Sequence, residues 1–201
     1  MWLGKRFFDF ILSFIGLLFL SPLFLLLSFW IIIDSRGPVF FRQERVGLNG
    51  RIFRIHKFRS MIRDSSVKGL QITVGNDQRI TKAGKLLRKY KLDELPQLID
   101  VLYGKMSFVG PRPEVPKYVA FYSEEDRNIS LAVRPGITDL ASVHFKNESE
   151  ILALSENPEK EYIEKILPMK LKYHRQYVES ASLSGDLKLI IHTLKTIFIA
   201  R

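Results

Sequence analysis

A stretch of 24 residues, from Phe10 to Ile33, contains no charged side chain, and 18 of its residues are Leu, Ile or Phe. A helix rises about 1.5 Å per residue, so a straight helix of this length would exceed the roughly 30 Å hydrocarbon core of a bilayer. These side chains favour insertion by on the order of 5–10 kcal/mol, more than the roughly 3 kcal/mol that a proline inside a helix costs. The stretch predicts a membrane-embedded segment, and it exceeds the apolar core of about 7–15 residues that is typical of a cleaved signal peptide.

Ser21 and Pro22 lie in the middle of this apolar stretch. Pro22 has no N–H to donate to the carbonyl of Leu18, and its ring displaces that carbonyl, so a kink is expected. The Ser21 hydroxyl can satisfy part of the backbone that Pro22 frees. Two geometries follow: a bent helix that crosses the membrane, or a helix-break-helix hairpin that enters and leaves on one side.

Basic residues flank the stretch at both ends, and positive residues near a membrane favour its cytoplasmic side. They are Lys5, Arg6, Arg36, Arg42 and Arg45. This distribution fits a re-entrant hairpin with both ends in the cytoplasm. The spacing alone also allows an ordinary kinked single-pass anchor.

Composition limits what the rest of the chain can be. We divide it into a membrane hairpin at residues 1–36 and one cytoplasmic domain with membrane-surface helices at residues 37–201, long enough for one core. The absence of cysteine excludes disulfides and thiolate metal sites. A net charge of +10 predicts an anionic partner. Beside a membrane segment this means anionic phospholipids, and no nucleic acid is expected because no motif accompanies the charge.

Apolar periodicity predicts an α+β fold dominated by helices. Residues 38–41 and 51–58 are predicted strands of a small β-hairpin, with a turn at residues 47–50. The first predicted helix carries lysines and arginines on one face. It is either an amphipathic helix on the membrane surface or the outer helix of a core. The predicted helices cover residues 78–92, 93–103, 114–130, 159–177 and 187–198.

Two adjacent carboxylates, Asp93 and Glu94, stand where the second of these helices is expected to begin. The structural interpretation is an N-cap with an acidic first turn, which is common. In the functional interpretation, the dipole of the helix would lower the pKa of a carboxylate at its start. The carboxylate would then stay ionised as a nucleophile or metal ligand. On a helix the two side chains point about 100° apart, so one could attack while the other binds a divalent ion.

Arginines near this pair suggest a phosphorylated substrate. Arg112 and Arg134 stand in turns that prolines stiffen, and Arg88 precedes the carboxylates on the basic helix. Planar guanidinium groups on rigid backbone suit bidentate contact with phosphate. Together with the carboxylates they predict a diphosphate substrate and Mg²⁺, a hard cation that shares substrate phosphates.

Four blocks of the sequence carry a family resemblance. They are Lys57-Phe58-Arg59-Ser60-Met61, Leu92-Asp93-Glu94-Leu95-Pro96-Gln97, Met106-Ser107-Phe108-Val109-Gly110-Pro111-Arg112-Pro113 and Arg134-Pro135-Gly136-Ile137-Thr138. In order and in their place behind one apolar segment, they resemble the bacterial sugar transferase family of monotopic polyprenyl-phosphate phosphoglycosyl transferases. The resemblance covers residues from about 4 to 140, and the length is that of minimal, Campylobacter-type members.

The resemblance implies transfer of a sugar phosphate from a UDP-sugar to undecaprenyl phosphate, with release of UMP, at the cytoplasmic face of the bacterial inner membrane. Asp93 would be the nucleophile that forms a covalent phosphosugar intermediate, and Glu94 would help to hold Mg²⁺. A match at Ser21-Pro22 implies the re-entrant hairpin.

The resemblance also assigns the substrate-binding positions. Arg88 and Arg112 would contact phosphate, and the turn formed by Pro111, Arg112 and Pro113 would border the nucleotide. Lys57 and Arg59 match basic positions of the family near the site.

The resemblance weakens after Thr138, where many members read roughly Gly-Trp-Ala-Gln-Val-Asn-Gly-Arg. This chain instead has Asp139-Leu140-Ala141-Ser142-Val143-His144. The segment that follows either contacts the sugar or serves packing, and the sequence does not name the sugar. Two other functions stay open: a non-catalytic, membrane-anchored basic scaffold that binds anionic lipids, and a transferase that moves the sugar without its phosphate.

Overall fold

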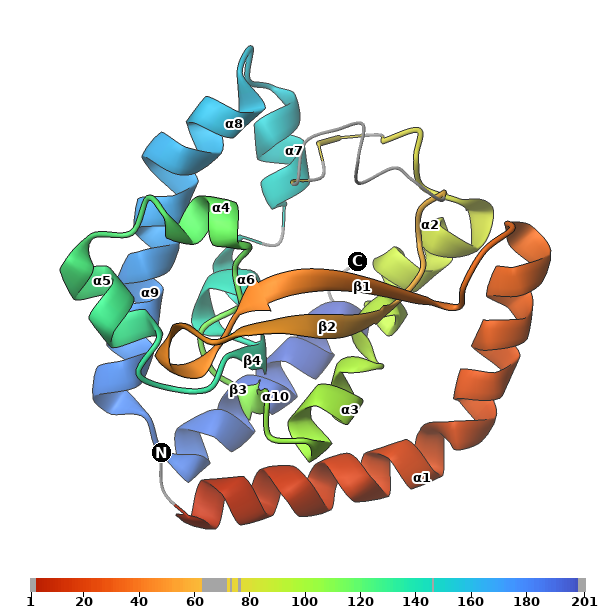
Figure 1. Cartoon of the computed structure of the whole chain (residues 1–201), viewed down its shortest axis with the longest axis horizontal. Coiled ribbons are helices and arrows are strands. Elements are labelled where there is room, and N and C mark those ends of the chain that lie inside the picture. Colours follow the sequence, from red (N-terminus) through yellow and green to blue (C-terminus); the bar gives the residue numbers. More distant parts are fainter. Residues whose placement is uncertain (1–2, 63–71, 73, 76, 146, 199–201) are drawn as a thin grey trace.

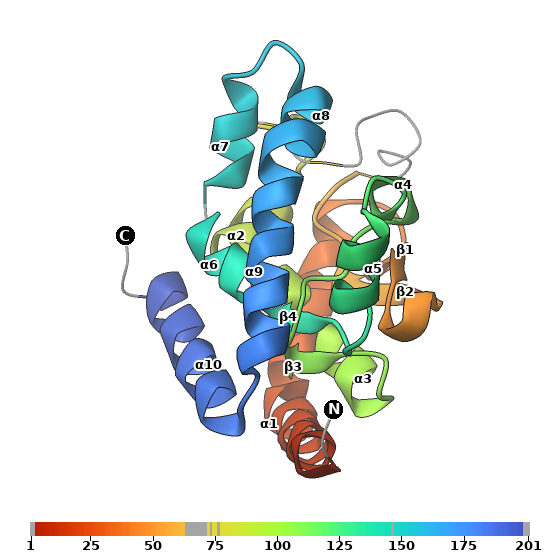
Figure 2. The same ribbon diagram turned by 90° about the vertical axis from the view of Figure 1, so that its left-hand side faces the viewer.

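The computed structural model describes residues 3–62, 72, 74–75, 77–145 and 147–198. Helices dominate, and they surround a two-stranded hairpin and a second, very short pair of strands (Figures 1 and 2). The predicted α+β class, dominated by helices, is confirmed. Most of residues 61–74, between the second predicted strand and the first predicted helix, lie outside the described residues.

The elements follow one another closely along the chain. In order they are α1 (Leu3–Asp34), β1 (Phe40–Val46), the 3₁₀ turn η1 (Leu48–Gly50), β2 (Ile52–Phe58), α2 (Lys82–Lys89), the 3₁₀ turn η2 (Leu92–Glu94), α3 (Gln97–Leu102), β3 (Ser107–Val109), α4 (Pro116–Val119), α5 (Glu124–Ser130), β4 (Gly136–Thr138), α6 (Leu140–His144), α7 (Glu148–Ala153), α8 (Pro158–Glu161), the π turn η3 (Tyr162–Ile166), α9 (Leu167–Ser180) and α10 (Leu183–Phe198).

The apolar stretch forms α1, which bends sharply along its length (Figure 1). Pro22 lies inside this helix, and the Ser21 hydroxyl donates a hydrogen bond of 2.8 Å to the carbonyl of Leu18. That carbonyl is the one that Pro22 deprives of its usual donor. The predicted kink and the predicted role of Ser21 are therefore confirmed, and the break is a bend within one continuous helix.

Both halves of α1 pack on the same domain. The first half lies along α3, and the second half buries Leu27 and Ile31 against Phe58 of β2 and Leu87 of α2. Each end is also fixed by polar contacts. Lys5 forms a buried ion pair with Asp186 of α10, and the Asp34 carboxylate accepts the Ala83 N–H of α2 at 2.9 Å.

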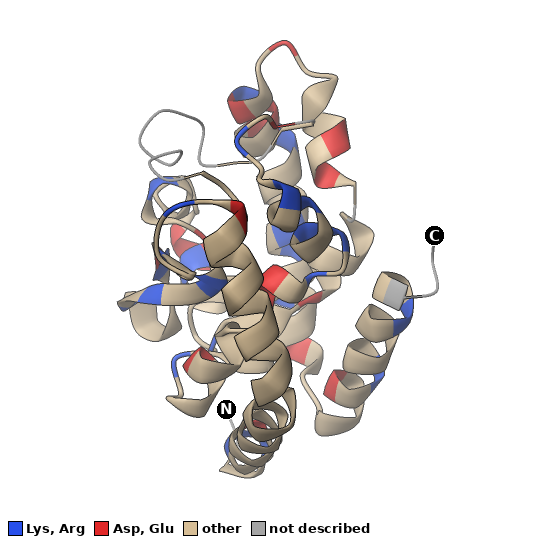
Figure 3. Cartoon of the chain, turned by 90° about the vertical axis from the view of Figure 1, so that its right-hand side faces the viewer, with Lys and Arg blue, Asp and Glu red and all other residues tan. Residues whose placement is uncertain are grey.

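By length and composition, α1 is the one helix among the described residues that could cross a membrane. Only 11% of its most apolar window is buried within the chain. Figure 3 shows α1 free of charged residues along its middle. Large apolar side chains of α1 are exposed. They include Phe10, Phe14, Leu18, Phe19, Leu25, Leu26 and Phe29. A bilayer is the natural environment for this surface, while the re-entrant placement and the division at residue 36 stay predictions.

The predicted hairpin is confirmed, because β1 pairs antiparallel with β2 and Val46 lies opposite Ile52. Its turn uses Asn49 at φ 54° and Gly50 at φ 75°, conformations that these residue types tolerate best. The first strand was predicted at residues 38–41, and this is wrong. It begins at Phe40 and continues through a charged run, which is tolerated because the side chains alternate toward solvent.

The helix predicted to begin at Asp93 begins only at Gln97. Lys91 adopts a left-handed conformation with φ 54°, which ends the preceding segment, and Pro96 then occupies the N-cap of α3. Asp93 therefore lies in a separate 3₁₀ turn. The helix ends at Leu102, next to the predicted end at residue 103, and Gly104 follows with a φ of 74°.

Four other predictions about elements needed correction. The predicted helix at residues 114–130 is two helices, α4 and α5, because Ser123 adopts an extended conformation and caps a new start. The last helix begins at Leu183, and α6 and α7 were not predicted. No strand was predicted near the proline-stiffened turn at Arg112, yet β3 pairs parallel with β4. This is possible because Gly110 and Gly136 approach so closely that a Cβ on Gly136 would lie 2.2 Å from the Gly110 nitrogen.

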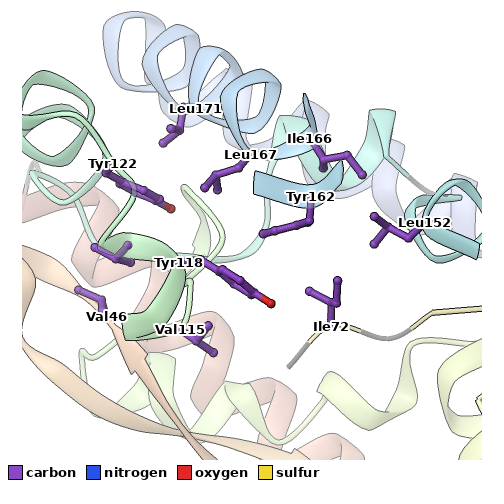
Figure 4. Close-up of a cluster of buried hydrophobic side chains, with 11 residues drawn as sticks. Val46, Ile72, Val115, Tyr118, Tyr122, Leu152, Tyr162, Ile166, Leu167 and Leu171 are labelled. Atoms are coloured by element: carbon purple, nitrogen blue, oxygen red, sulfur yellow. The ribbon is translucent and has the colours of Figure 1, made fainter. Parts of the chain in front are cut away.

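The largest apolar core joins the hairpin, α4 and the C-terminal helices (Figure 4). Tyr118 of α4 and Tyr162 of η3 lie at its centre, with ring centroids 4.8 Å apart. Val46 at the end of β1 and Leu171 of α9 belong to the same cluster. This packing brings the C-terminal third of the chain against the segment that follows β3.

Candidate active site

Asp93 and Glu94 lie in η2, between the basic helix α2 and α3, and both are buried. The left-handed residue Lys91 reverses the chain immediately before them. The two carboxylates have different partners, and these partners give them different chemistry.

Glu94 is fixed by two cations. Its Oε1 accepts the Lys57 ammonium of β2 at 2.8 Å, and its two oxygens accept both terminal nitrogens of Arg112, with Nη1 at 3.2 Å from Oε2. Burial alone would raise the pKa of Glu94, but the charges of Arg112 and Lys57 outweigh it and bring that pKa well below the usual range. Glu94 is an ionised carboxylate that orients Lys57 and Arg112.

Asp93 lacks such partners. Among the described residues its Oδ1 is buried and accepts no hydrogen bond. Burial and the adjacent Glu94 charge raise the pKa of Asp93, although Lys57, Arg88 and Lys91 oppose them. We expected a helix dipole to lower this pKa, and the expectation was wrong because Asp93 lies in a three-residue turn rather than at a helix start. A desolvated carboxylate with a free oxygen is a more reactive group than a capped one.

Arg88 completes the cationic side of the site. It lies in the last turn of α2, where its Nε donates to the Ser60 hydroxyl at 2.9 Å, and its charge acts on Asp93. The structure thus brings Lys57, Arg88 and Arg112 around the carboxylate pair.

The turn at Pro111, Arg112 and Pro113 is fixed on both of its flanks. The Pro111 carbonyl accepts the Gly136 N–H at 3.0 Å, and the Pro113 carbonyl accepts Arg45 Nη1 at 3.0 Å. The predicted rigid turn is therefore present, and it aims the Arg112 side chain at Glu94.

Arg59 and Arg134 are not brought to the carboxylates. The Arg59 guanidinium donates to the carbonyls of Ile31 and Ser35 at the end of α1, 3.1 and 2.5 Å away. Arg134 Nε donates to the Gly104 carbonyl at 2.7 Å, beyond the opposite end of α3. Their positions suit structural roles in the folded chain.

Sequence reasoning missed several neighbours of the site. Ser60 belongs to one of the four sequence blocks but was given no role, although its hydroxyl accepts Arg88 Nε. Arg45 was noted only as a basic residue flanking the apolar stretch, although it donates to the Pro113 carbonyl. Lys91 gave no signal, because nothing in the sequence marks it for a left-handed backbone. Asp139 was noticed only as a departure from the family pattern, although its carboxylate accepts the Arg112 N–H at 3.3 Å.

A divalent cation would find few protein ligands here. The described residues contain no cluster of three or more His, Cys, Asp or Glu side chains that could hold one. Asp93 offers its unpartnered oxygen, and Glu94 keeps one free acceptor position on Oε2. Mg²⁺ is compatible with such a sparse set, because it usually keeps waters and shares substrate phosphates.

Comparison with known proteins identifies the family of the chain. The model of the bacterial sugar transferase family matches residues 1–200. The chain is 38% identical over 199 residues to the UDP-glucose:undecaprenyl-phosphate glucose-1-phosphate transferase of Klebsiella pneumoniae, covering 97% of this chain and 40% of that protein. It is 36% identical over 198 residues to a UDP-N-acetylgalactosamine-undecaprenyl-phosphate N-acetylgalactosaminephosphotransferase of Aeromonas hydrophila, covering 96% of this chain and 43% of the relative.

A relative of similar length is also found. The exopolysaccharide production protein ExoY of Rhizobium meliloti is 31% identical over 214 residues, covering 99% of this chain and 87% of its own length. The chain thus spans less than half of the first two relatives and most of the third. With a family match over almost all of its residues, the chain belongs to the bacterial sugar transferase family.

Proposed function

We propose that this protein transfers a sugar phosphate from a UDP-sugar to undecaprenyl phosphate and releases UMP. The observation that carries the proposal is the buried Asp93 carboxylate, which has an unpartnered oxygen beside three cationic side chains. The names of the relatives from Klebsiella and Aeromonas support the donor and acceptor classes.

In the first step, an Asp93 oxygen attacks the β-phosphorus of the UDP-sugar. A new P–O bond forms to Asp93 while the bond to the bridging oxygen breaks, and UMP leaves with that oxygen. Displacement at phosphorus needs mainly positioning and charge stabilisation. Arg112 and Arg88 are placed to stabilise phosphate charge, and Glu94 keeps Arg112 and Lys57 in position.

In the second step, a phosphate oxygen of undecaprenyl phosphate attacks the same phosphorus. The bond to Asp93 breaks, which regenerates the carboxylate and leaves a polyprenyl diphosphate sugar. Because UMP leaves before undecaprenyl phosphate attacks the covalent intermediate, the kinetics should be ping-pong.

Mg²⁺ is part of the proposal. Asp93 and Glu94 are the residues that would hold it, together with the diphosphate, and when bound it supplies charge stabilisation to the phosphates. The site itself positions the phosphate through Arg112 and excludes water from Asp93 through burial.

We place the protein in the bacterial inner membrane, with the catalytic domain on the cytoplasmic face. Because both ends of α1 are fastened to one domain, a re-entrant helix explains the structure better than a crossing. The exposed lysines of α2 lie next to the second half of α1, where they can contact anionic phospholipids. They are Lys82, Lys85 and Lys89.

The proposal is tested with the full chain in detergent, incubated with Mg²⁺, undecaprenyl phosphate and a panel of UDP-sugars. We expect UMP rather than UDP with at least one donor, and UDP release would indicate transfer of the sugar alone. Without undecaprenyl phosphate, mass spectrometry should find a sugar phosphate on the peptide that contains Asp93.

Asp93→Asn should lower kcat by on the order of 10³-fold or more, because a nucleophile is removed. It should leave binding to liposomes unchanged. Asp126→Asn, at a capped helix start in α5, is the matched control and should keep full turnover. Absence of UMP with every donor, combined with intact liposome binding, would favour the non-catalytic scaffold instead.

A further inference from the structure

The Pro111–Arg112–Pro113 turn has an unusual backbone. Neither proline carries an N–H, so the Arg112 amide is the only backbone donor of the three residues. That N–H points to Asp139 and is 3.3 Å from its Oδ2. The carbonyls of the two prolines fix the flanks of the turn, and the Asp139 carboxylate holds the backbone of Arg112 between them.

The topology explains why Asp139 reaches this turn. The turn follows β3 and Asp139 follows β4, and these two strands are parallel neighbours. The carboxyl ends of parallel strands meet at one edge of a sheet, so residues just beyond the two strands lie side by side. The Gly110 N–H donates to the Thr138 carbonyl at 3.2 Å. This hydrogen bond extends the pairing of β3 and β4 to the residues next to Arg112 and Asp139.

Asp139 is itself held rigidly. It is 1% exposed, and its second oxygen accepts the Ser142 N–H at 2.7 Å, so it also caps α6. His174 of α9, likewise buried, places Nε2 at 3.5 Å from Oδ2 of Asp139 and Nδ1 at 3.3 Å from the Ser130 hydroxyl. Although burial alone would raise the pKa of Asp139, the nearby His174 side chain and the Ser142 N–H outweigh it and lower that pKa. The carboxylate is an ionised acceptor at neutral pH.

We infer that Asp139 is a positioning residue, which fixes the backbone of Arg112 so that its guanidinium meets Glu94. The inference rests on the proposed function, because Arg112 and Glu94 belong to that site. The chain of contacts runs from α9 through His174 and Asp139 to Arg112, and from there to Glu94. It assigns a role to the position at which this chain departs from the family pattern.

Two variants separate positioning from helix capping. Asp139→Ser keeps a side-chain oxygen that caps α6, since serine is a favoured N-cap, but this single short side chain cannot also reach the Arg112 amide. Asp139→Ala removes both contacts. Asn157→Ala is the matched control, because it removes the N-cap of α8 (Asn157 Oδ1 to the Lys160 N–H, 3.1 Å) away from the turn.

The readouts are kcat/KM with the UDP-sugar, hydrogen–deuterium exchange of the peptide that contains Arg112, and the melting temperature, all on the full chain in detergent. Asp139→Ser should lower kcat/KM by about tenfold to a hundredfold, as expected for a lost hydrogen bond to a charged group. It should also speed exchange at Arg112, with little change in melting. Asp139→Ala should add a lower melting temperature, and Asn157→Ala should lower only the melting temperature.

Unchanged kcat/KM in Asp139→Ser overturns the inference, as does a kinetic loss without faster exchange at Arg112. In both cases a wild-type chain that releases UMP leaves the proposed function standing. A wild-type chain that releases no UMP with any donor contradicts the proposed function itself, and the exchange measurement then reports on the contact alone.

Discussion

The Ser21 hydroxyl lies 2.8 Å from the carbonyl oxygen of Leu18, the acceptor that Pro22 leaves without a backbone donor. An unsatisfied carbonyl is costly in hydrocarbon, so this bond would make the bend tolerable inside a bilayer. The bend lets both halves of α1 reach one domain, where Lys5 and Asp34 fasten the two ends.

Pro22→Ala should therefore straighten α1. Alanine restores the N–H that the Leu18 carbonyl lacks, and a straight helix of 32 residues is long enough to cross the bilayer. Because the chain has no cysteine, single cysteines at Gly4 and Arg36, both exposed, report the two ends cleanly. In inverted or right-side-out vesicles, a membrane-impermeant thiol reagent should label both ends from the same side in the otherwise unchanged protein. In the Pro22→Ala background it should label them from opposite sides.

Ser21→Ala is the companion variant, since it keeps the proline and removes only the hydroxyl. We expect same-side labelling with lower thermal stability. Labelling from opposite sides with Pro22 in place would contradict the re-entrant placement.

Asp93→Asn should make the folded protein more stable as well as inactive. Burial and Glu94 raise the pKa of Asp93 above its unfolded value, so the ionised form is disfavoured in the folded state. This destabilisation is absent at low pH, where Asp93 is neutral, and it develops as the pH rises through the folded pKa. The variant should thus melt about 2–4 °C higher than wild type at pH 8, which corresponds to about 1 kcal/mol in a chain of this size. A difference that stays constant from pH 4 to pH 8 would contradict this explanation.

Glu94→Gln should have the opposite effect on stability. The charges of Arg112 and Lys57 keep the pKa of Glu94 low, so its contribution is present above its unfolded pKa and is lost as the pH falls through the folded value. Removing the charge leaves two cations without their partner, and we expect a loss of about 2–3 kcal/mol at pH 7.5. Thermal melts at pH 7.5 and pH 4 should show the gap beginning to narrow on acidification, because pH 4 is just below the unfolded pKa of a glutamate and still above the folded pKa of Glu94.

The control for this prediction is Glu164→Gln. Glu164 forms an exposed ion pair with Lys160 at 3.9 Å, which should contribute at most about 0.5 kcal/mol. A similar loss of stability in both variants would show that the Glu94 contacts contribute no more than an exposed ion pair.

The sequence predicted the parts of the fold that local chemistry decides. Pro22 implies a kink wherever it occurs in a helix, and the Asn-Gly pair at residues 49–50 implies a turn. Features that depend on tertiary contacts were not predicted. Nothing local indicates that Lys91 adopts a left-handed backbone, so the start of α3 was placed four residues too early.

The same distinction applies to the site. Motif blocks identified Asp93, Glu94, Lys57 and Arg112, and the structure brings these four together. Adjacency in sequence did not reveal that Glu94 forms ion pairs with Lys57 and Arg112 while an oxygen of Asp93 stays without a hydrogen bond, because the partners of Glu94 come from β2 and from the turn after β3. Asp139 was invisible as a site residue, since its relation to Arg112 arises only when β4 pairs with β3.

For Arg59 the family resemblance and the structure suggest different roles: the resemblance suggests substrate binding, and the geometry suggests a structural contact with α1. Its guanidinium binds the carbonyls of Ile31 and Ser35, which end α1, and it is 5% exposed. Arg59→Met keeps the apolar stem and removes these bonds, so we expect a loss of about 1–3 kcal/mol in stability. Because the group faces α1 rather than the carboxylates, kcat/KM should stay within about threefold of wild type at a temperature where the variant is folded. Arg88→Met, which removes a cation that acts on Asp93, should lower kcat/KM by on the order of a hundredfold. If Arg59→Met lost activity to the same extent while its melting temperature stayed unchanged, Arg59 would be a substrate-binding residue after all.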